Sequence, residues 1–350
     1  MIKVQNIYYM LSYAFQTLKK DSYEKLATED FRNTGDLFAA ILAIGIGNQI
    51  KRGLGKEYVL MNEELSLPKS KIMVSESIKR QTAMSKHLVC QYDEFSENIY
   101  LNQIIKTTAM LLIRSDIKNK NKKALKKVLI FFDRVDLIDP ISIQWNRISY
   151  NRNNKTYQLL INICYLTIKG MLLSNDRGER KLSNFIDDQN MSRLYEKFVL
   201  GYFIKEYPEL TIDASYVPWD ITEDTANDYL PAMHTDVTIK NKNDILIIDT
   251  KWYQNGSASD SYYGNKQIFH SGNLYQIYAY VKNMKASATG SVSGMLLYAK
   301  ADEDIAPDST FKIGGDNISV RTLDLACDFN DIKAQLDSII ENAFSVNSDN

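Results

Sequence analysis

The residues most capable of chemistry lie on two neighbouring predicted strands in the second half of the chain. Thr235–Lys240 and Asp244–Lys251 are rich in β-branched residues, and the Asn-Lys-Asn-Asp sequence at their junction predicts a hairpin turn. Because side chains on a strand alternate between faces, Asp249 and Lys251 should project from the same side. Asp236, near the start of the first strand, lies opposite the end of the second. The hairpin can therefore bring all three side chains together.

Two carboxylates and a lysine at the end of an apolar hairpin are costly to bury without a role. Neighbouring carboxylates repel unless a cation lies between them, and Mg²⁺ prefers oxygen ligands of this kind. The lysine can orient or deprotonate a water, while the metal stabilises charge on a phosphate, as phosphodiester hydrolysis requires. The alternative is that Asp249 and Lys251 cap the strand end and pair at the surface.

Two predicted helices flank this hairpin and carry polar residues of their own. Glu196 lies in an apolar stretch of the helix predicted over residues 190–206, where an acid is unusual. Gln276 and Tyr280 are four residues apart on the next helix and so share one face. Three features follow one another along the chain: a helix with an acid, a hairpin with Asp and Asp-x-Lys, and a helix with Gln-x-x-x-Tyr. Together, in this order, they indicate a catalytic site more specifically than any one of them does alone.

The rest of the chain supplies the elements that must position these residues. Hydrophobic periodicity predicts helices over residues 7–15, 36–49, 98–113, 157–173, 190–206, 273–282 and 330–344. Further strands are expected over residues 58–61, 71–75, 210–217, 293–298 and 318–322, and a Gly/Ser/Tyr loop over 256–264. Helices and strands do not alternate strictly, which predicts an α/β (α+β) fold with a mixed sheet. Residues 174–181 are the best linker candidate.

Composition limits the class of protein. The 350 residues are 45% hydrophobic and 24% charged, which is typical of a globular protein and excludes a disordered or coiled-coil chain. No apolar run is long enough to span a membrane, and no signal peptide is expected. The three cysteines form no disulfide framework, so a reducing cytoplasm is the simplest compartment.

The net charge of −1 hides an asymmetry. Residues 1–180 carry 28 Lys and Arg against 18 Asp and Glu, whereas residues 181–350 carry 14 against 25. We therefore expect two domains, residues 1–180 and 181–350, with different partners. The lysine run from Lys118 to Lys127 is either a contact for DNA or a partner, or a solvated helical face.

Other motifs are weaker. His270, at the start of the helix that carries Gln276, has either a structural or a catalytic role, and Ser271 or Asn273 could cap that helix. His87 and His234 are isolated, and no His/Cys spacing suits zinc. No Walker A sequence is present, so this chain should not hydrolyse nucleotide by itself.

The order of these residues resembles the PD-(D/E)xK nuclease superfamily and, within it, the McrC nuclease subunits of the modified-cytosine restriction systems called McrBC. Five separate segments carry the resemblance: Asn6–Ala14, Asn102–Thr107, Leu230–Asp236, Ile247–Tyr253 and Phe269–Gln276. One position departs from the family, which often has a basic residue where this chain has Ala232. That difference concerns a phosphate contact and leaves the metal site intact.

The resemblance implies a restriction-endonuclease-like domain over residues 181–350 that cuts double-stranded DNA with Mg²⁺. Residues 1–180 would be an adaptor that contacts and stimulates a McrB-like hexameric AAA+ GTPase, and no membrane is involved. By carry-over, Asp236, Asp249 and the Thr250 carbonyl would hold the metal, and Lys251 would position or activate the attacking water. Glu196 and Gln276 would orient ligands, water or phosphate.

Two other functions stay open at this point. The chain could be a non-catalytic adaptor that regulates the GTPase, although the complete set of two acids and a lysine argues against it. It could also be a standalone repair or RNA nuclease on the same fold, which would cut without a partner or GTP.

Overall fold

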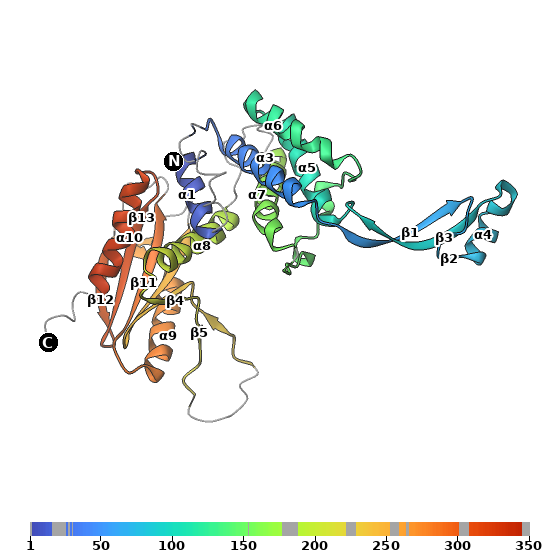
Figure 1. Cartoon of the computed structure of the whole chain (residues 1–350). Coiled ribbons are helices and arrows are strands. Elements are labelled where there is room, and N and C mark those ends of the chain that lie inside the picture. Colours follow the sequence, from blue (N-terminus) through green and yellow to red (C-terminus); the bar gives the residue numbers. More distant parts are fainter. Residues whose placement is uncertain are drawn as a thin grey trace. The chain divides into compact units, whose positions relative to one another are not determined.

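A computed structural model describes residues 2–15, 26, 29, 31–152, 154–176, 188–221, 229–252, 259–263, 266–300 and 308–344. The chain forms two compact units (Figure 1). We call Met1–Thr34 together with Ile186–Asn350 the sheet unit, and Gly35–Phe185 the helical unit. In the described residues, no helix has the length and apolar character needed to cross a membrane.

The N-terminal boundary of the predicted domains is wrong, because residues 1–34 belong with the second half of the chain. The reason is the packing of α1 (Val4–Ala14) against α8 (Asp188–Glu206), where Tyr13 lies 5.2 Å from Tyr202 and 5.9 Å from Phe198 between ring centroids. Asn6 is 1% exposed and donates to the carbonyl oxygens of Leu325 and Cys327. Of the predicted linker, residues 174–176 end a helix and the rest lies outside the described residues.

A six-stranded mixed sheet is the centre of the sheet unit. Its strand order is β12 (Ser309–Ile313), β13 (Asp316–Asp324), β11 (Val292–Lys300), β8 (Asp244–Trp252), β7 (Val237–Asn241) and β4 (Thr211–Asp213). β11 pairs in parallel with both β8 and β13, and the other pairs are antiparallel. Besides α8, the sheet packs against α9 (Ser271–Ser287) and α10 (Phe329–Phe344). The predicted mixed α/β class is confirmed.

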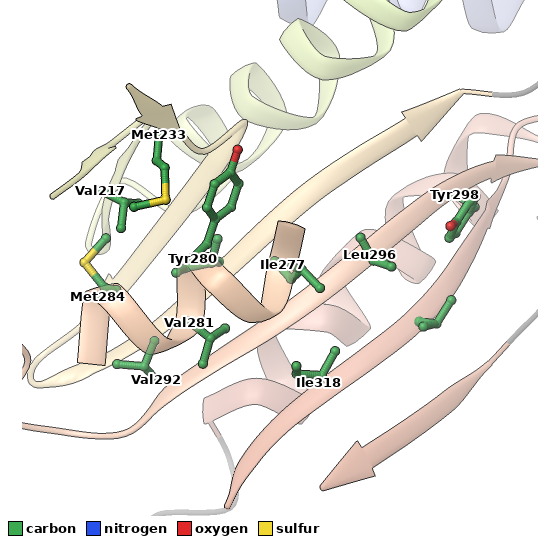
Figure 2. Close-up of a cluster of buried hydrophobic side chains, with 12 residues drawn as sticks. Val217, Met233, Ile277, Tyr280, Val281, Met284, Val292, Leu296, Tyr298 and Ile318 are labelled. Carbon is green, nitrogen blue, oxygen red and sulfur yellow. The ribbon is translucent and has the colours of Figure 1, made fainter. Parts of the chain in front are cut away.

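The crossover from β8 through α9 to β11 builds one hydrophobic core. Figure 2 shows Ile277 and Val281 of α9 among the buried side chains that line β11 and the neighbouring strands. Gly294 of β11 is required here, because an added Cβ would lie 2.8 Å from both Ile277 and Val281. This close approach holds α9 against the strand that follows it, and α9 in turn carries Gln276 and Tyr280.

Short paired strands complete the sheet unit. β5 (Tyr216–Val217) pairs with β6 (Met233–His234), and β9 (Ser259–Tyr263) pairs with β10 (Lys266–Phe269). The predicted loop over 256–264 is therefore wrong for residues 259–263, while its other positions lie outside the described residues. The predicted strand over 210–217 is two strands, β4 and β5. β12 was not predicted; it is only five residues long and mostly exposed.

The helical unit contains α3 (Thr34–Arg52), α5 (Tyr100–Arg114), α6 (Asn119–Leu129) and α7 (Gln158–Asp176). A ribbon of β1 (Glu57–Leu65) and β3 (Leu88–Ser96) extends from these helices, with β2 (Lys71–Ile72) and α4 (Val74–Lys79) toward its far end (Figure 1). Single 3₁₀ turns cover Thr82–Ser85, Ile130–Phe132, Pro140–Ser142, Trp145–Arg147 and Lys155–Tyr157.

The base of the ribbon is fixed by buried polar contacts. Tyr157 OH accepts a hydrogen bond from Gly55 N at 2.7 Å and donates to Asn102 Oδ1 at 2.8 Å. Asn102 Nδ2 donates to the carbonyl oxygens of Gly55 and Glu97, at the two ends where the ribbon joins the helices. The sequence did not predict β3, and residues 74–75 begin α4 rather than continuing a strand.

Candidate active site

The predicted hairpin is confirmed. β7 and β8 pair from Val237↔Ile248 to Asn241↔Asp244, so the two-residue turn is Lys242-Asn243, with Lys242 at a φ of 54°. Extending this register by one place sets Asp236 opposite Asp249. Gly290 packs on the turn so closely that an added Cβ would lie 2.2 Å from the Asn243 carbonyl oxygen. The turn is therefore held at the end of the hairpin remote from the carboxylates.

The Asp236 carboxylate is held by the opposite strand. Its Oδ2 accepts hydrogen bonds from Thr250 N and Thr250 Oγ1, each 2.7 Å long. A strand residue directs its N–H and C=O toward the same neighbour, so the Thr250 carbonyl also lies on the Asp236 side. Two donors on one oxygen leave the other carboxylate oxygen for a cation.

Asp249 and Lys251 lie on one face of β8, as the alternation of side chains predicted. Asp249 is 2% exposed, and its Oδ2 is 2.6 Å from Lys251 Nζ. Within the part of the chain that the structure describes, no donor reaches this oxygen with hydrogen-bond geometry. Burial raises the pKa of Asp249 to about 6, and the charge of Asp236 acts in the same direction while Lys251 opposes it.

Lys251 is joined to α9 by a chain of hydrogen bonds. Lys251 Nζ donates to Gln276 Oε1 at 3.0 Å, and Gln276 Nε2 donates to the Tyr280 hydroxyl at 2.8 Å. Figure 2 shows the Tyr280 ring extending from α9, with its hydroxyl at the tip farthest from the helix. The amide of Gln276 is thus fixed at both ends, so its oxygen, not its nitrogen, faces the ammonium.

Glu196 lies on α8, in the electrostatic field of both aspartates. Its pKa is raised, first by burial and then by the charge of Asp236, with a smaller contribution from Asp249. Lys197 and Arg193 oppose this shift. The adjacent Tyr195 is 0% exposed, and its ring lies 6.0 Å from that of Trp252 on β8. The structure therefore places Glu196 near the carboxylates, without a hydrogen bond from the described residues to it.

Two further groups near Lys251 were missed at the sequence level. The register of β8 and β11 places Tyr298 beside Lys251, and the Tyr298 hydroxyl accepts a hydrogen bond from Asn273 Nδ2 at 2.9 Å. Asn273 precedes Gln276 by three residues, so helical spacing could have revealed it. The N-cap of α9 is His270, not Ser271 or Asn273 as expected.

The donor set fits a hard divalent cation. Among the described residues, no three His, Cys, Asp or Glu side chains gather as a metal-binding group. Mg²⁺ does not need such a group, since proteins usually hold it through one or two carboxylates while waters and substrate phosphates complete its octahedron. Asp236, Asp249 and the Thr250 carbonyl supply oxygen ligands of that type, and the buried Oδ2 of Asp249 has the Lys251 ammonium as its charge partner.

Comparisons with known proteins identify the family of the chain. A curated relative, the "Type IV methyl-directed restriction enzyme EcoKMcrBC" of Escherichia coli (strain K12), is 28% identical over 346 residues, covering 97% of each chain. A solved assembly of Thermococcus gammatolerans McrB AAA+ hexamers with bound McrC matches with a TM-score of 0.52 and 16% identity, covering 97% of this chain and 76% of that chain. The T. gammatolerans McrBC complex matches with a TM-score of 0.43 and 20% identity over 58% of each chain. Residues 3–299 match the family described as McrBC 5-methylcytosine restriction system component, and the chain therefore belongs to that family.

Proposed function

We propose that this chain is the nuclease subunit of a GTP-dependent restriction complex and hydrolyses DNA phosphodiester bonds with Mg²⁺. The observation that carries the proposal is the convergence of Asp236, Asp249 and Lys251 at one end of the β7–β8 hairpin, with Gln276 in contact with the lysine. Membership of the McrBC family supplies the restriction context. A structural ion pair at a strand end would not require the second carboxylate or the amide.

Asp236, Asp249 and the Thr250 carbonyl would hold the Mg²⁺. When bound, the ion acts as a Lewis acid that stabilises negative charge on the scissile phosphate. Ionised Asp249 is disfavoured in the apo chain, because burial raises its pKa to about 6. A divalent cation offsets that penalty, so the site is arranged to bind metal, and below about pH 6 binding also releases a proton.

Lys251 is the group that orients or activates the attacking water. Its side chain is 18% exposed and touches Asp249 on one side and Gln276 on the other, which fixes the nitrogen at the edge of the site. Gln276 is a positioning residue for Lys251, and Tyr280 positions Gln276 in turn. Glu196, whose raised pKa reflects burial beside Asp236, orients a ligand or water from α8.

The helical unit is the adaptor in this proposal, and its partner is a McrB-like hexameric AAA+ GTPase. The T. gammatolerans assembly consists of McrB AAA+ hexamers with bound McrC, and its fold matches almost all of this chain. This chain has no Walker A motif, so nucleotide hydrolysis must come from another subunit. The substrate is double-stranded DNA, with 5-methylcytosine as the cue for which the family is named.

The test uses the full chain with a McrB-like GTPase partner, GTP, Mg²⁺ and a methylated plasmid. Asp249→Asn and Lys251→Gln should each abolish cutting, while assembly and stimulation of the GTPase persist. Lys240→Gln, on the neighbouring strand β7, is the matched control and should cut normally. Cutting at the normal rate by either site variant contradicts the assignment. Cutting by the wild-type chain without partner or GTP would identify a standalone nuclease instead.

A further inference from the structure

Helix α6 of the helical unit presents a strongly basic face. Its buried residues, Asn121 at 5% and Leu125 at 0% exposed, lie on one side. With 3.6 residues per turn, four lysines fall away from that side. We call them the basic face: Lys122, Lys123, Lys126 and Lys127.

The basic face has no compensating acid. Residues 117–132 contain no Asp or Glu, and among the described residues no ion pair reaches any of these four lysines. Lys122 and Lys126, like Lys123 and Lys127, are four apart and repel one another on the helix surface. Three of the four are exposed and Lys122 is half-buried, so the ammonium groups are accessible.

Buried contacts hold α6 firmly in spite of this repulsion. Asp36 on α3 is 0% exposed, and its Oδ1 accepts a hydrogen bond of 2.6 Å from Lys118 N at the start of α6. Asn121 Nδ2 donates both to that carboxylate oxygen, at 3.2 Å, and to the Asp36 carbonyl oxygen, at 3.1 Å. An acid at a helix N-terminus also stabilises the helix dipole. The lysines are therefore presented on a fixed frame.

From this arrangement we infer that the basic face of α6 binds the phosphate backbone of duplex DNA. The inference rests on the proposed function for its choice of DNA as ligand, but it does not require that the chain cuts. Lysine is a common phosphate ligand, acting as a point charge, whereas protein–protein interfaces are depleted in lysine and enriched in arginine and aromatic residues. Four lysines with no arginine among them suit phosphates and no particular base sequence.

The test measures the salt dependence of DNA binding by the full-length chain. The probe is a fluorescent, unmodified 30-base-pair duplex in EDTA, where metal-dependent cutting cannot occur. The variant is Lys123→Gln/Lys126→Gln/Lys127→Gln. Loss of three phosphate contacts should reduce the slope of log K against log salt by about 2 to 3, and weaken binding by about tenfold per lysine near 100 mM salt.

The matched control removes three exposed cations from elsewhere in the helical unit, as Lys51→Gln/Arg52→Gln/Lys155→Gln. It should keep the wild-type slope to within about 1, since it removes no phosphate contact. Lysine acetylation read by mass spectrometry gives a second measurement on the unmutated chain. The duplex should protect the basic face, while Lys51 and Lys155 should stay reactive.

The inference is overturned if the α6 variant binds the duplex with the wild-type slope, if both triple variants lose equal affinity, or if the wild-type chain does not bind at low salt. Unchanged DNA binding together with lost assembly would assign the face to the protein partner and overturn it as well. Because binding is measured without metal, a chain that binds through α6 but never cuts contradicts only the proposed nuclease function.

Discussion

Replacing Asp249 by Asn should make the apo chain more stable relative to wild type as the pH rises from 4 to 7. The carboxyl of Asp249 is buried at 2% exposure, and its pKa is raised from 3.8 to about 6. Between these two values the folded chain holds a proton that the unfolded chain has released. The protonated carboxyl therefore contributes its full stabilisation of the folded wild-type chain below pH 3.8, the pKa in the unfolded chain. That contribution is lost as the pH rises through about 6, the pKa in the folded chain.

The size of the effect follows from that shift. About two pKa units correspond to about 3 kcal/mol, because one unit is worth ~1.36 kcal/mol. The Asn variant has no charge to bury, so its unfolding free energy relative to wild type should increase by about that amount across this window. It also removes the carboxylate that can act as the charge partner of the Lys251 ammonium.

Mg²⁺ should reverse this difference by stabilising the wild-type chain more than the variant. A ligand present at about one hundred times its dissociation constant stabilises the state that binds it by ~2.7 kcal/mol. At pH 7.5, Mg²⁺ should raise the unfolding free energy of the wild-type chain by this amount. It should raise that of the Asn variant only a little, because the variant lacks one of the two carboxylates. Urea unfolding followed by tryptophan fluorescence at pH 4, 5.5 and 7.5, with and without Mg²⁺, measures both effects.

Parallel stability curves for wild type and variant between pH 4 and 7 would refute the reasoning about Asp249. Equal stabilisation of both proteins by Mg²⁺ would show that the ion binds elsewhere. Asp213→Asn is the matched control, because Asp213 lies on β4 of the same sheet and accepts a hydrogen bond from Ser215. It removes a carboxylate without changing the site, and it should behave as wild type in both measurements.

Three other substitutions test the frame around the site. Tyr280→Phe removes the hydroxyl that accepts from Gln276, a loss of about 1 kcal/mol, so single-turnover cutting should slow by about fivefold with unchanged DNA affinity. An unchanged rate would remove Tyr280 from the positioning chain. Gly201→Ala places a Cβ 2.3 Å from the Tyr13 carbonyl oxygen and should cost about 1 to 3 kcal/mol in thermal unfolding. A neutral result would contradict the packing of α1 on α8. Asp36→Ala removes the acceptor at the start of α6 and should cost about 1 to 3 kcal/mol. Proteolysis within α6 should increase, and wild-type resistance would count against that anchor.

The parts of the site that sequence could predict are those governed by local periodicity. Alternation along β8 placed Asp249 beside Lys251, and helical spacing placed Tyr280 beside Gln276. The contact between Lys251 and Gln276 was not predictable in the same way. It joins residues from a strand and the following helix, and it depends on how closely α9 approaches β11 at Gly294.

Strand β3 of the ribbon escaped prediction, and β1 was predicted only over residues 58–61, for a related reason. Strands are recognised when one face is buried, because apolar and polar residues then alternate. β1 is exposed along most of its length, and β3 is buried only near Val89, Cys90 and Tyr92. Their pairing is fixed by backbone hydrogen bonds and by the anchored base at Gly55, neither of which leaves a pattern in the sequence.

The domain boundary shows where composition misleads. Charge changes sign near residue 180, between α7 and α8, where the helical unit also ends. The charge balance says nothing about α1, which contains no charged residue and buries aromatic residues against α8 and α10. Tyr9 stacks on Phe329 with ring centroids 4.1 Å apart, and Tyr13 OH donates to Glu206. α8 also carries Glu196, so the first helix of the chain braces a helix of the candidate site. A fragment beginning at residue 186 would lack that support, and studies of the catalytic end should therefore retain residues 1–34.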